Sequence, residues 1–331
     1  MAANYNAEPL LEVNGLKQYF QVSRTYAVRA VDDVSFKIWP GETYSLVGES
    51  GSGKSTIGRA VIRLYNPTAG TVQFNGMDIS GKMSRQTEKN LRRQMQMIFQ
   101  DPMASLNPRK TIGDIIGEGL DIHHSCQNAG EREARIKAML RKVGLDPEHH
   151  SRYPHRFSGG QRQRVGIARA LALEPEILVC DEATSALDVS VQGKVVELLA
   201  KLQKEKGISI LFICHDLALV ALLTHRVVVM YLGNVVEILC AKDLPKAKHP
   251  YTQALMKSVF PLQPKGKADV QLLRGEIPSP LDVPKGCPFQ NRCDKCMPVC
   301  REKKPARMEL SEGHIVACHL FAKDQEETKG A

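Results

Sequence analysis

The sequence predicts an α/β fold, because strand-like runs alternate with helical patterns along the chain. Residues 177–180 and 208–214 are short and almost wholly apolar, which is typical of strands covered on both faces of a sheet. Between them, residues 191–202 have apolar side chains at helical spacing. Residues 43–47 form a further strand-like run that leads directly into a glycine-rich turn. This order of elements predicts a sheet with helices packed on it.

The segments around this core differ in character. Residues 71–79 have a hairpin pattern in which Asn75-Gly76 supplies the two positive-φ positions of a type I′ turn, so we expect antiparallel strands near the N-terminus. Residues 102–162 are polar and helical, which predicts an inserted helical subdomain. After Cys240, clustered prolines and cysteines predict a small appendage with little core of its own.

Composition narrows the class of protein. The chain has 331 residues, of which 43% are hydrophobic and 24% charged, enough for one large or two modest cores. The net charge of +9 comes from basic residues spread over the whole chain, so it permits an anionic partner without choosing one. We expect no secretory signal, and no run approaches the roughly 20 apolar residues of a membrane span. Nine cysteines without an export signal argue against a disulfide framework.

A phosphate-binding loop follows the strand predicted at residues 43–47. Residues 48–55, GESGSGKS, fit the pattern G-x-x-x-x-G-K-[ST] between a strand and a helix. Glycines let backbone N–H groups close around phosphate oxygens, and the helix N-terminus adds a favourable dipole. Lys54 is expected on the β- and γ-phosphates, and the Ser55 hydroxyl on Mg²⁺. The residues expected at the nucleotide are Gly48, Glu49, Ser50, Gly51, Ser52, Gly53, Lys54, Ser55 and Thr56.

Two carboxylates follow the apolar run at residues 177–180. In isolation, Asp181 and Glu182 are most simply read as the acidic start of a helix. A P-loop, however, requires a second metal ligand and a group that handles water. We therefore expect Asp181 to hold Mg²⁺, directly or through water, and Glu182 to orient or deprotonate the attacking water.

Further segments complete a pattern that resembles the ABC ATPase family. Residues 157–164, FSGGQRQR, are similar to its signature sequence, with Phe157 where leucine is commoner. Gln100 resembles the Q-loop glutamine, residues 185–188 resemble the D-loop, and His215 resembles the switch histidine. Each segment alone is weak evidence, but together their order and spacing are those of the family.

The resemblance implies a fold and a mechanism. The fold is a P-loop NTPase (RecA-like) core with an N-terminal antiparallel β-subdomain, an inserted α-helical subdomain and a small C-terminal cysteine-containing extension. Two subunits stack head to tail, so that the signature segment of one closes over ATP on the other. The catalytic residues implied are Glu182, His215 and Gln100, and Gln100 is also implied at Mg²⁺ with Ser55 and Asp181. The signature and D-loop residues implied at the nucleotide are Ser158, Gly159, Gly160, Gln161 and Asp188.

An aromatic side chain of such an ATPase usually stacks on adenine. We expect Phe20 in this role, with Tyr19 and Tyr26 as alternatives, and an ordinary core aromatic is an equally good interpretation of Phe20. Only one P-loop and one signature sequence occur in the chain, so the closed site requires a second copy or a related protein.

Other segments resemble one branch of the family, the oligopeptide, dipeptide and nickel importers. They are residues 101–109 (DPMASLNPR), 152–157 (RYPHRF) and 249–255 (HPYTQAL), the last of which opens the C-terminal extension of those ATPases. The resemblance implies an ABC ATPase domain over residues 8–245, with its helical subdomain at about 102–162, and an extension over 246–331.

This branch also implies partners and a location. The partners are a second ABC ATPase subunit, more often a paralogue than a second copy, two transmembrane permease subunits and, indirectly, an external substrate-binding protein. The location is peripheral, at the cytoplasmic face of the inner cell membrane. Di- and oligopeptides, nickel and other small cargo stay open. A soluble ABC protein of ribosomes or DNA is a competing class, but such chains usually carry two cassettes or a coiled coil, so we expect no nucleic-acid partner.

Four cysteines of the tail resemble the pattern that holds a 4Fe–4S cluster in this branch: Cys287, Cys293, Cys300 and Cys318. Soft thiolates bind iron strongly, and a metal that closes several loops stabilises a small appendage. Zinc is the alternative occupant of four thiolates, and Cys296 is a spare that could replace one ligand. A further alternative function is a soluble ABC ATPase whose iron–sulfur or zinc tail handles metal or clusters.

Overall fold

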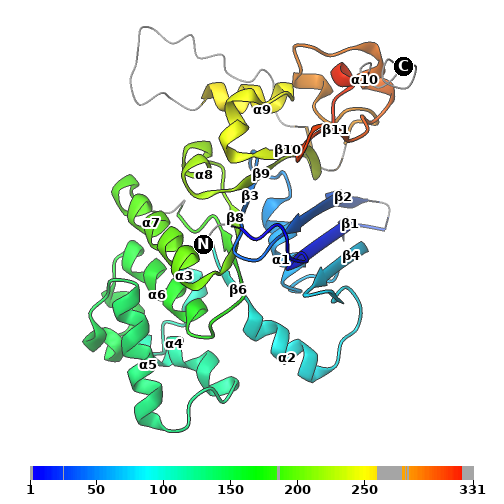
Figure 1. The fold of residues 1–331 in the computed structure, drawn as a ribbon. Helices are drawn as coiled ribbons and strands as arrows, with labels where there is room; N and C mark the ends of the chain where they lie inside the picture. The colour runs from blue at the N-terminus through cyan, green and yellow to red at the C-terminus, as the bar shows by residue number, and fades with distance from the viewer. Residues whose placement is uncertain are drawn as a thin grey trace, which may run out of the picture. The chain divides into compact units, whose positions relative to one another are not determined.

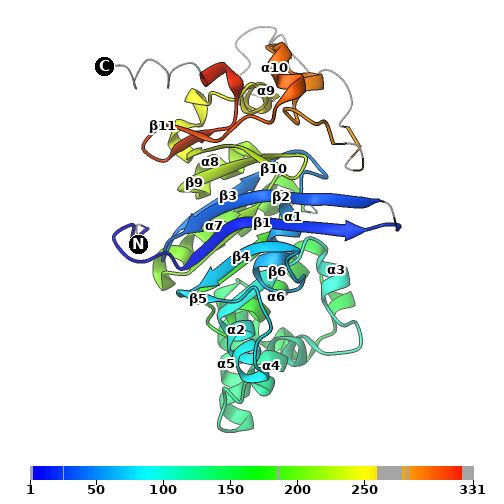
Figure 2. The ribbon, with the colours of Figure 1, turned by 90° about the vertical axis from the view of Figure 1, so that its right-hand side faces the viewer.

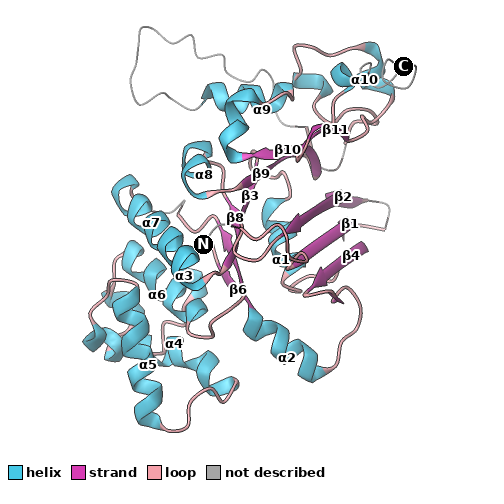
Figure 3. Ribbon diagram, viewed as in Figure 1, coloured by secondary structure: helices cyan, strands magenta, loops and turns pink. Residues whose placement is uncertain are grey.

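The computed structural model describes residues 3–24, 26–184, 187–258, 278–279, 281 and 283–322. The chain forms two compact units. The first comprises Met1–Leu10, Ile38–Thr43 and Gly81–Ile213, and the second comprises Leu11–Lys37, Tyr44–Ser80 and Cys214–Ala331. Both units contain strands as well as helices (Figure 3).

The first unit contains a parallel sheet in the order β8-β7-β6. Its strands are β6 (Met95–Ile98), β7 (Ile177–Asp181) and β8 (Ser209–Ile213). Every residue of β7 and β8 is buried. This is the burial that their apolar runs predict for strands covered on both faces.

Helices make up most of the rest of the first unit. They are α2 (Arg85–Gln94), α3 (Pro102–Ser105), α4 (Ile112–Ile122), α5 (Ala129–Lys142), α6 (Gly159–Leu171) and α7 (Val189–Lys206), with 3-10 turns at Pro147–Ser151 and Pro154–Arg156. The predicted insertion, residues 102–162, holds α3, α4, α5 and the first turn of α6. Thr111 and Asn128 begin α4 and α5, where each side chain accepts an N–H of the first helical turn.

In the second unit, an antiparallel sheet has the order β2-β1-β4-β5, of which β2, β1 and β4 are labelled side by side in Figure 1. Its strands are β1 (Leu11–Gln21), β2 (Ala27–Ile38), β4 (Ala69–Phe74) and β5 (Met77–Asp78). Asn75 and Gly76 join β4 to β5 with φ angles of 49° and 73°. The hairpin that the Asn-Gly pair predicts is therefore confirmed.

A second sheet of this unit has strands in the order β11-β12-β10-β9-β3. They are β3 (Thr43–Val47), β9 (Arg226–Tyr231), β10 (Asn234–Cys240), β11 (Met308–Ser311) and β12 (His314–Val316). β3 and β9 are parallel, and the other pairs are antiparallel. The unit's helices are α1 (Lys54–Val61), α8 (Leu217–Leu223), α9 (Pro250–Ser258) and α10 (Pro298–Glu302), and its 3-10 turns are Ala241–Lys246, Gln290–Arg292 and His319–Phe321.

The C-terminal tail, predicted to have little core of its own, packs on neighbouring strands of the second unit. β12 pairs with β10, where Val316 lies opposite Glu237. Phe289 of the tail packs against Tyr231 and Tyr251, with both ring-centre distances 5.2 Å. All three rings are at most 2% exposed. The extension, which includes α9, therefore shares a core with β9 and β10, beside which it lies (Figure 2).

Candidate active site

The predicted P-loop joins β3 to α1. Gly48 and Gly53 have φ angles of 151° and 96°, which residues other than glycine rarely adopt. Both also pass close to backbone, because a Cβ on Gly48 would overlap the Met230 carbonyl and one on Gly53 the Ala30 carbonyl. Only glycine fits these two positions. The loop thus carries its N–H groups to the N-terminus of α1, where anions bind favourably.

Lys54 is the first residue of α1 and is only 4% exposed. Its Nζ donates to the carbonyl oxygens of Gly48 and Glu49, each at 2.8 Å, and to Ser52 Oγ at 3.2 Å. The loop itself therefore fixes where the ammonium charge lies. Ser55 and Thr56 follow in the first turn of α1, and both are half-buried.

Two predicted catalytic side chains meet at the end of β7. Asp181 ends the strand and is fully buried, and the next residue, Glu182, has a φ of 46°. This left-handed conformation costs a non-glycine residue on the order of 1 kcal/mol, and such strain gathers at functional sites. Glu182 Oε2 accepts a hydrogen bond from Gln100 Nε2 at 2.7 Å. The structure therefore joins the Q-loop glutamine to the expected general base.

The signature segment forms the start of α6. Ser158 is the N-cap: its hydroxyl accepts the N–H of Gln161 at 3.3 Å, and Gln161 Oε1 accepts the N–H of Ser158 at 3.0 Å. The N–H groups of Gly159 and Gly160 are at the helix start, where no intrahelical acceptor exists. A Cβ on Gly159 would meet no atom within 4 Å. Packing around Gly159 within this chain therefore does not require glycine.

The remaining motif residues lie at the starts of helices. His215 is exposed in the turn before α8. Asp188 is the exposed N-cap residue of α7, where its carbonyl accepts the N–H groups of Val191 and Gln192. Ser185 and Ala186 of the D-loop lie outside the described residues. The P-loop, Phe20 and His215 belong to the second unit, whereas Gln100, Asp181, Glu182, the signature segment and Asp188 belong to the first.

The three aromatic candidates for adenine stand in different surroundings. Phe20 is half-buried near the end of β1, and its ring packs edge-on against Tyr65 at 5.3 Å. Burial, together with a 2.7 Å hydrogen bond to the Asp32 carboxylate, raises the pKa of Tyr19 to about 12. Tyr26 is 62% exposed. The Tyr19 hydroxyl is thus held by the hydrogen bond to Asp32, whereas Phe20 packs against Tyr65 and Tyr26 is exposed.

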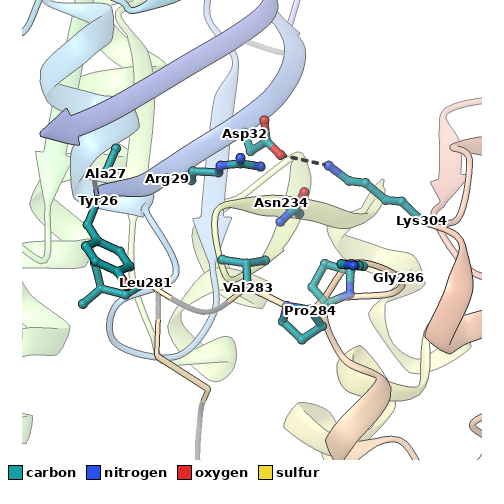
Figure 4. Close-up of a pocket in the computed structure, with 12 residues that line it drawn as sticks. Tyr26, Ala27, Arg29, Asp32, Asn234, Leu281, Val283, Pro284, Gly286 and Lys304 are labelled. Carbon is teal, nitrogen blue, oxygen red and sulfur yellow. Dashed lines mark hydrogen bonds and ion pairs between the residues drawn. The ribbon is translucent and has the colours of Figure 1, made fainter. Parts of the chain in front are cut away.

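Tyr26 lines a cavity of about 510 Å³ between β2 and the C-terminal extension. Arg29, Asp32 and Asn234 face the same cavity (Figure 4). Burial alone would raise the pKa of Asp32, but hydrogen bonds from Tyr19 and Lys304 outweigh it and lower the pKa. The carboxylate is therefore ionised and ties β2 to the extension.

Sequence reasoning missed the contacts of Glu49, the second residue of the P-loop. Its carboxylate accepts two hydrogen bonds from Arg292, at 2.6 and 3.0 Å, which raise the pKa of the guanidinium. Its N–H donates to the hydroxyl of Tyr251 at 2.9 Å. Glu49 is 202 positions from Tyr251 and 243 positions from Arg292 in the sequence, and no motif connects residues that far apart. Tyr251 lies in the HPYTQAL segment, whose resemblance to the importer branch gives no indication of its contact with Glu49.

The four predicted cluster ligands lie in the extension. Cys287, Cys300 and Cys318 are each 7% exposed, and the N–H of Cys287 donates to the Cys300 carbonyl at 2.7 Å. Burial, and to a smaller extent the neighbouring thiols, raises the pKa of Cys287 to about 12. Within the described part of the chain, no three His, Cys, Asp or Glu side chains are grouped to hold a metal ion. As placed, the thiols do not fit a cluster, and the mechanism uses none.

Comparison with known proteins decides the family. The family described as "ABC transporter" matches residues 31–185, and the one described as "Oligopeptide/dipeptide transporter, C-terminal region" matches residues 236–300. The putative oligopeptide transport ATP-binding protein YkfD of Bacillus subtilis is 50% identical over 316 residues, covering 95% of this chain and 96% of the relative. This chain belongs to the oligopeptide-transporter family of ABC ATPases.

A further relative and a solved structure support the same family and fold. The oligopeptide transport ATP-binding protein OppF of Haemophilus influenzae is 47% identical, covering 96% of this chain and 99% of the relative. Among solved structures, the dimeric post-hydrolysis ATP-binding cassette MJ0796 with ADP and Pi matches with a TM-score of 0.64 and 28% identity, covering 70% of this chain and 98% of that chain. The predicted P-loop NTPase fold is therefore confirmed.

The family also establishes the reaction. As an ABC ATPase, the chain binds ATP with Mg²⁺ and hydrolyses it. The alternative of an ATPase devoted to metal or cluster handling finds no support among these relatives. Within the described residues, no helix is both long enough and apolar enough to span a membrane.

Proposed function

We propose that this ABC ATPase energises a membrane importer of dipeptides or oligopeptides. The observation that carries the proposal is the pairing of an ABC domain with an oligopeptide-type C-terminal region in one chain. Relatives that align over 95% and 96% of the chain are named for oligopeptide transport. Nickel or other small cargo has less support, because those names specify peptides.

The proposed assembly has one copy of this chain beside a second ABC ATPase, which we propose is a paralogue. Two permease subunits span the membrane, and the ATPases bind them peripherally at the cytoplasmic face. An external substrate-binding protein delivers the peptide, and no nucleic acid takes part. The single P-loop and single signature sequence support the need for a second ATPase.

We propose the following division of labour at the ATP site. The P-loop N–H groups and Lys54 bind the phosphates, and Ser55, Gln100 and Asp181 hold Mg²⁺. Glu182 takes the proton of the attacking water, and the 2.7 Å hydrogen bond from Gln100 orients its carboxylate. The groups proposed to act on ATP held by the other subunit are Ser158, Gly159, Gly160, Gln161 and Asp188, while His215 responds to the γ-phosphate.

Two further assignments are proposals of the same kind. Phe20 is proposed to stack on adenine, and the support is its half-buried ring near the end of β1, which packs edge-on against Tyr65. The domain division, 8–245 and 246–331 with a helical subdomain at 102–162, is proposed as a division of the sequence. The two parts are not packed separately, because Phe289 packs on Tyr231 of β9 and β12 pairs with β10.

Purification from detergent-solubilised membranes tests the importer. With an affinity tag on this chain, we expect two integral membrane subunits and a different ABC ATPase to copurify in equal amounts. Recovery of this chain as the only ATPase beside the permeases would contradict the paralogue. Copurification with ribosomes or DNA instead of membrane subunits would contradict the importer itself.

For the tail, we propose that a 4Fe–4S cluster, with zinc as the alternative, draws together Cys287, Cys293, Cys300 and Cys318, which as placed in the described part of the chain are not grouped to hold a metal. Its support is the soft-donor chemistry of the thiols and their shared neighbourhood, in which Cys300, Cys318 and Cys293 each contribute to the raised pKa of Cys287. Protein purified without oxygen should be brown and should contain about four iron atoms and about four labile sulfides per chain. The Cys296→Ser variant should keep both. Colourless protein with freely titratable thiols would contradict any metal group, and one zinc per chain would replace the cluster.

A further inference from the structure

Glu49 of the P-loop is held from three sides. Its N–H donates to the Tyr251 hydroxyl at 2.9 Å, and its carbonyl accepts from Lys54 Nζ at 2.8 Å. Its carboxylate accepts from Nη1 and Nη2 of Arg292 at 2.6 and 3.0 Å. Lys54 belongs to the same loop, but Tyr251 and Arg292 come from the C-terminal region. That region therefore grips the loop at both main chain and side chain.

The arginine that grips Glu49 is itself fixed. Its side chain is 5% exposed, and Nη1 also donates to the Tyr231 hydroxyl at 3.4 Å. Tyr231 and Tyr251 pack ring to ring at 4.8 Å, and Phe289 packs on both. A planar guanidinium held by a bidentate carboxylate against packed rings has little freedom to turn. The extension thus presents Arg292 to the loop as a rigid group.

Charge gives this contact a second effect. Glu49 carries a carboxylate within a loop that binds a polyanion, and like charges at short range repel. The paired guanidinium of Arg292 cancels that charge, and Glu49 is only partly screened by water because its side chain is 24% exposed. Loss of Arg292 would therefore free the loop and also leave an uncompensated negative charge beside the phosphates.

We propose that Arg292 and Tyr251 are positioning residues of the ATP site, through which the C-terminal extension holds the P-loop in its phosphate-binding conformation. Both act through Glu49, whose carbonyl is shared with Lys54. The inference rests on the proposed role of the P-loop and Lys54 in binding ATP. It gives the extension a part in nucleotide binding that needs no metal in the tail.

The test compares ATP affinity in purified full-length variants with KM and kcat of the assembled ATPase. A fluorescent ATP analogue with Mg²⁺ is the probe for affinity. Arg292→Met should weaken binding and raise KM about tenfold, with kcat within about twofold of wild type, because it loosens the loop but removes no catalytic group. Tyr251→Phe keeps the ring and loses only one hydrogen bond, so the expected loss is about threefold.

The double variant separates the charge of Glu49 from the hold on the loop. Glu49→Gln with Arg292→Met removes the repelling carboxylate but leaves the loop unheld, so affinity should recover only part of the roughly tenfold loss. Full recovery to wild-type affinity would mean that charge alone acts, and it would contradict the positioning role. Arg292→Lys keeps the charge without the bidentate geometry and should lie between wild type and Arg292→Met.

Controls keep the outcomes distinct. Arg301→Met removes an exposed arginine of α10 and should leave affinity and melting temperature unchanged. If Arg292→Met is unfolded at the assay temperature, the ATP affinities of Tyr251→Phe and Arg292→Lys are compared with wild type instead, and wild-type affinity in both would overturn the inference. Wild-type affinity in folded Arg292→Met overturns the inference, provided that Lys54→Ala does weaken binding. Wild-type affinity in Lys54→Ala would instead overturn the ATP-site assignment itself.

Discussion

Glu182→Gln should bind Mg²⁺-ATP with near wild-type affinity and hydrolyse it about 100- to 10,000-fold more slowly, because a general base contributes about that much. The amide keeps the size of the side chain but accepts no proton from water. The hydrogen bond from Gln100 can be retained by the amide oxygen, so the strained turn at residue 182 should persist. The measurement is phosphate release in single turnover, alongside ATP-dependent dimerisation by light scattering.

A closed, ATP-bound dimer should accumulate in this variant, since hydrolysis is what reopens the pair. Glu88→Gln is a matched control, because the Glu88 carboxylate forms an exposed ion pair with Arg92 on α2, at 3.1 Å. Its turnover should equal that of wild type. Near-normal turnover in Glu182→Gln would remove this residue from its proposed role.

Ser158→Tyr should lower hydrolysis in the assembled pair about 100- to 1,000-fold, the usual loss when a group that stabilises transition-state charge is removed. The isolated chain should bind ATP as wild type does, because the signature segment is proposed to act on the other subunit's nucleotide. The substitution also removes an N-cap, which costs about 1 kcal/mol of stability. The measurement is the ratio of turnover to single-chain ATP affinity.

A cap elsewhere controls for that loss. Ser84 caps α2 in the same way, because its hydroxyl accepts a hydrogen bond from the N–H of Thr87 at 3.1 Å. Ser84→Tyr should therefore lose similar stability and keep full turnover. If Ser158→Tyr abolished ATP binding to the single chain, the signature segment would act within its own subunit, contrary to the proposal.

The motifs that sequence reasoning found share one property: each is local. The positive φ of Gly53, 96°, is a local reason for glycine in the P-loop, and Asn75-Gly76 encodes its own turn. Buried parallel strands such as β7 show themselves as apolar runs. These features depend on short-range sterics and burial, so the sequence alone was enough to predict them.

What the sequence did not reveal depends on contacts between distant segments or on polar helices. α2 was not predicted, because Leu91 is its only buried residue and no apolar periodicity marks it. The pairing of β12 with β10 and the grip of Arg292 on Glu49 join segments far apart in the chain. The three aromatic candidates near β1 and β2 differ in their exposure and in their side-chain contacts, which sequence spacing does not encode.

The central claim is that ATP is bound at the P-loop of this chain and hydrolysed there. The most direct test is the rate of phosphate release from the purified assembly at saturating Mg²⁺-ATP, measured for wild type and Lys54→Ala, with ATP affinity of each single chain measured in parallel. Lys54 is buried with its ammonium held by the loop, and losing a charged hydrogen-bond donor to phosphate should weaken affinity about 10- to 100-fold. We predict that wild type hydrolyses ATP steadily and that the variant loses both binding and turnover. Equal binding and equal phosphate release from both proteins would contradict the account.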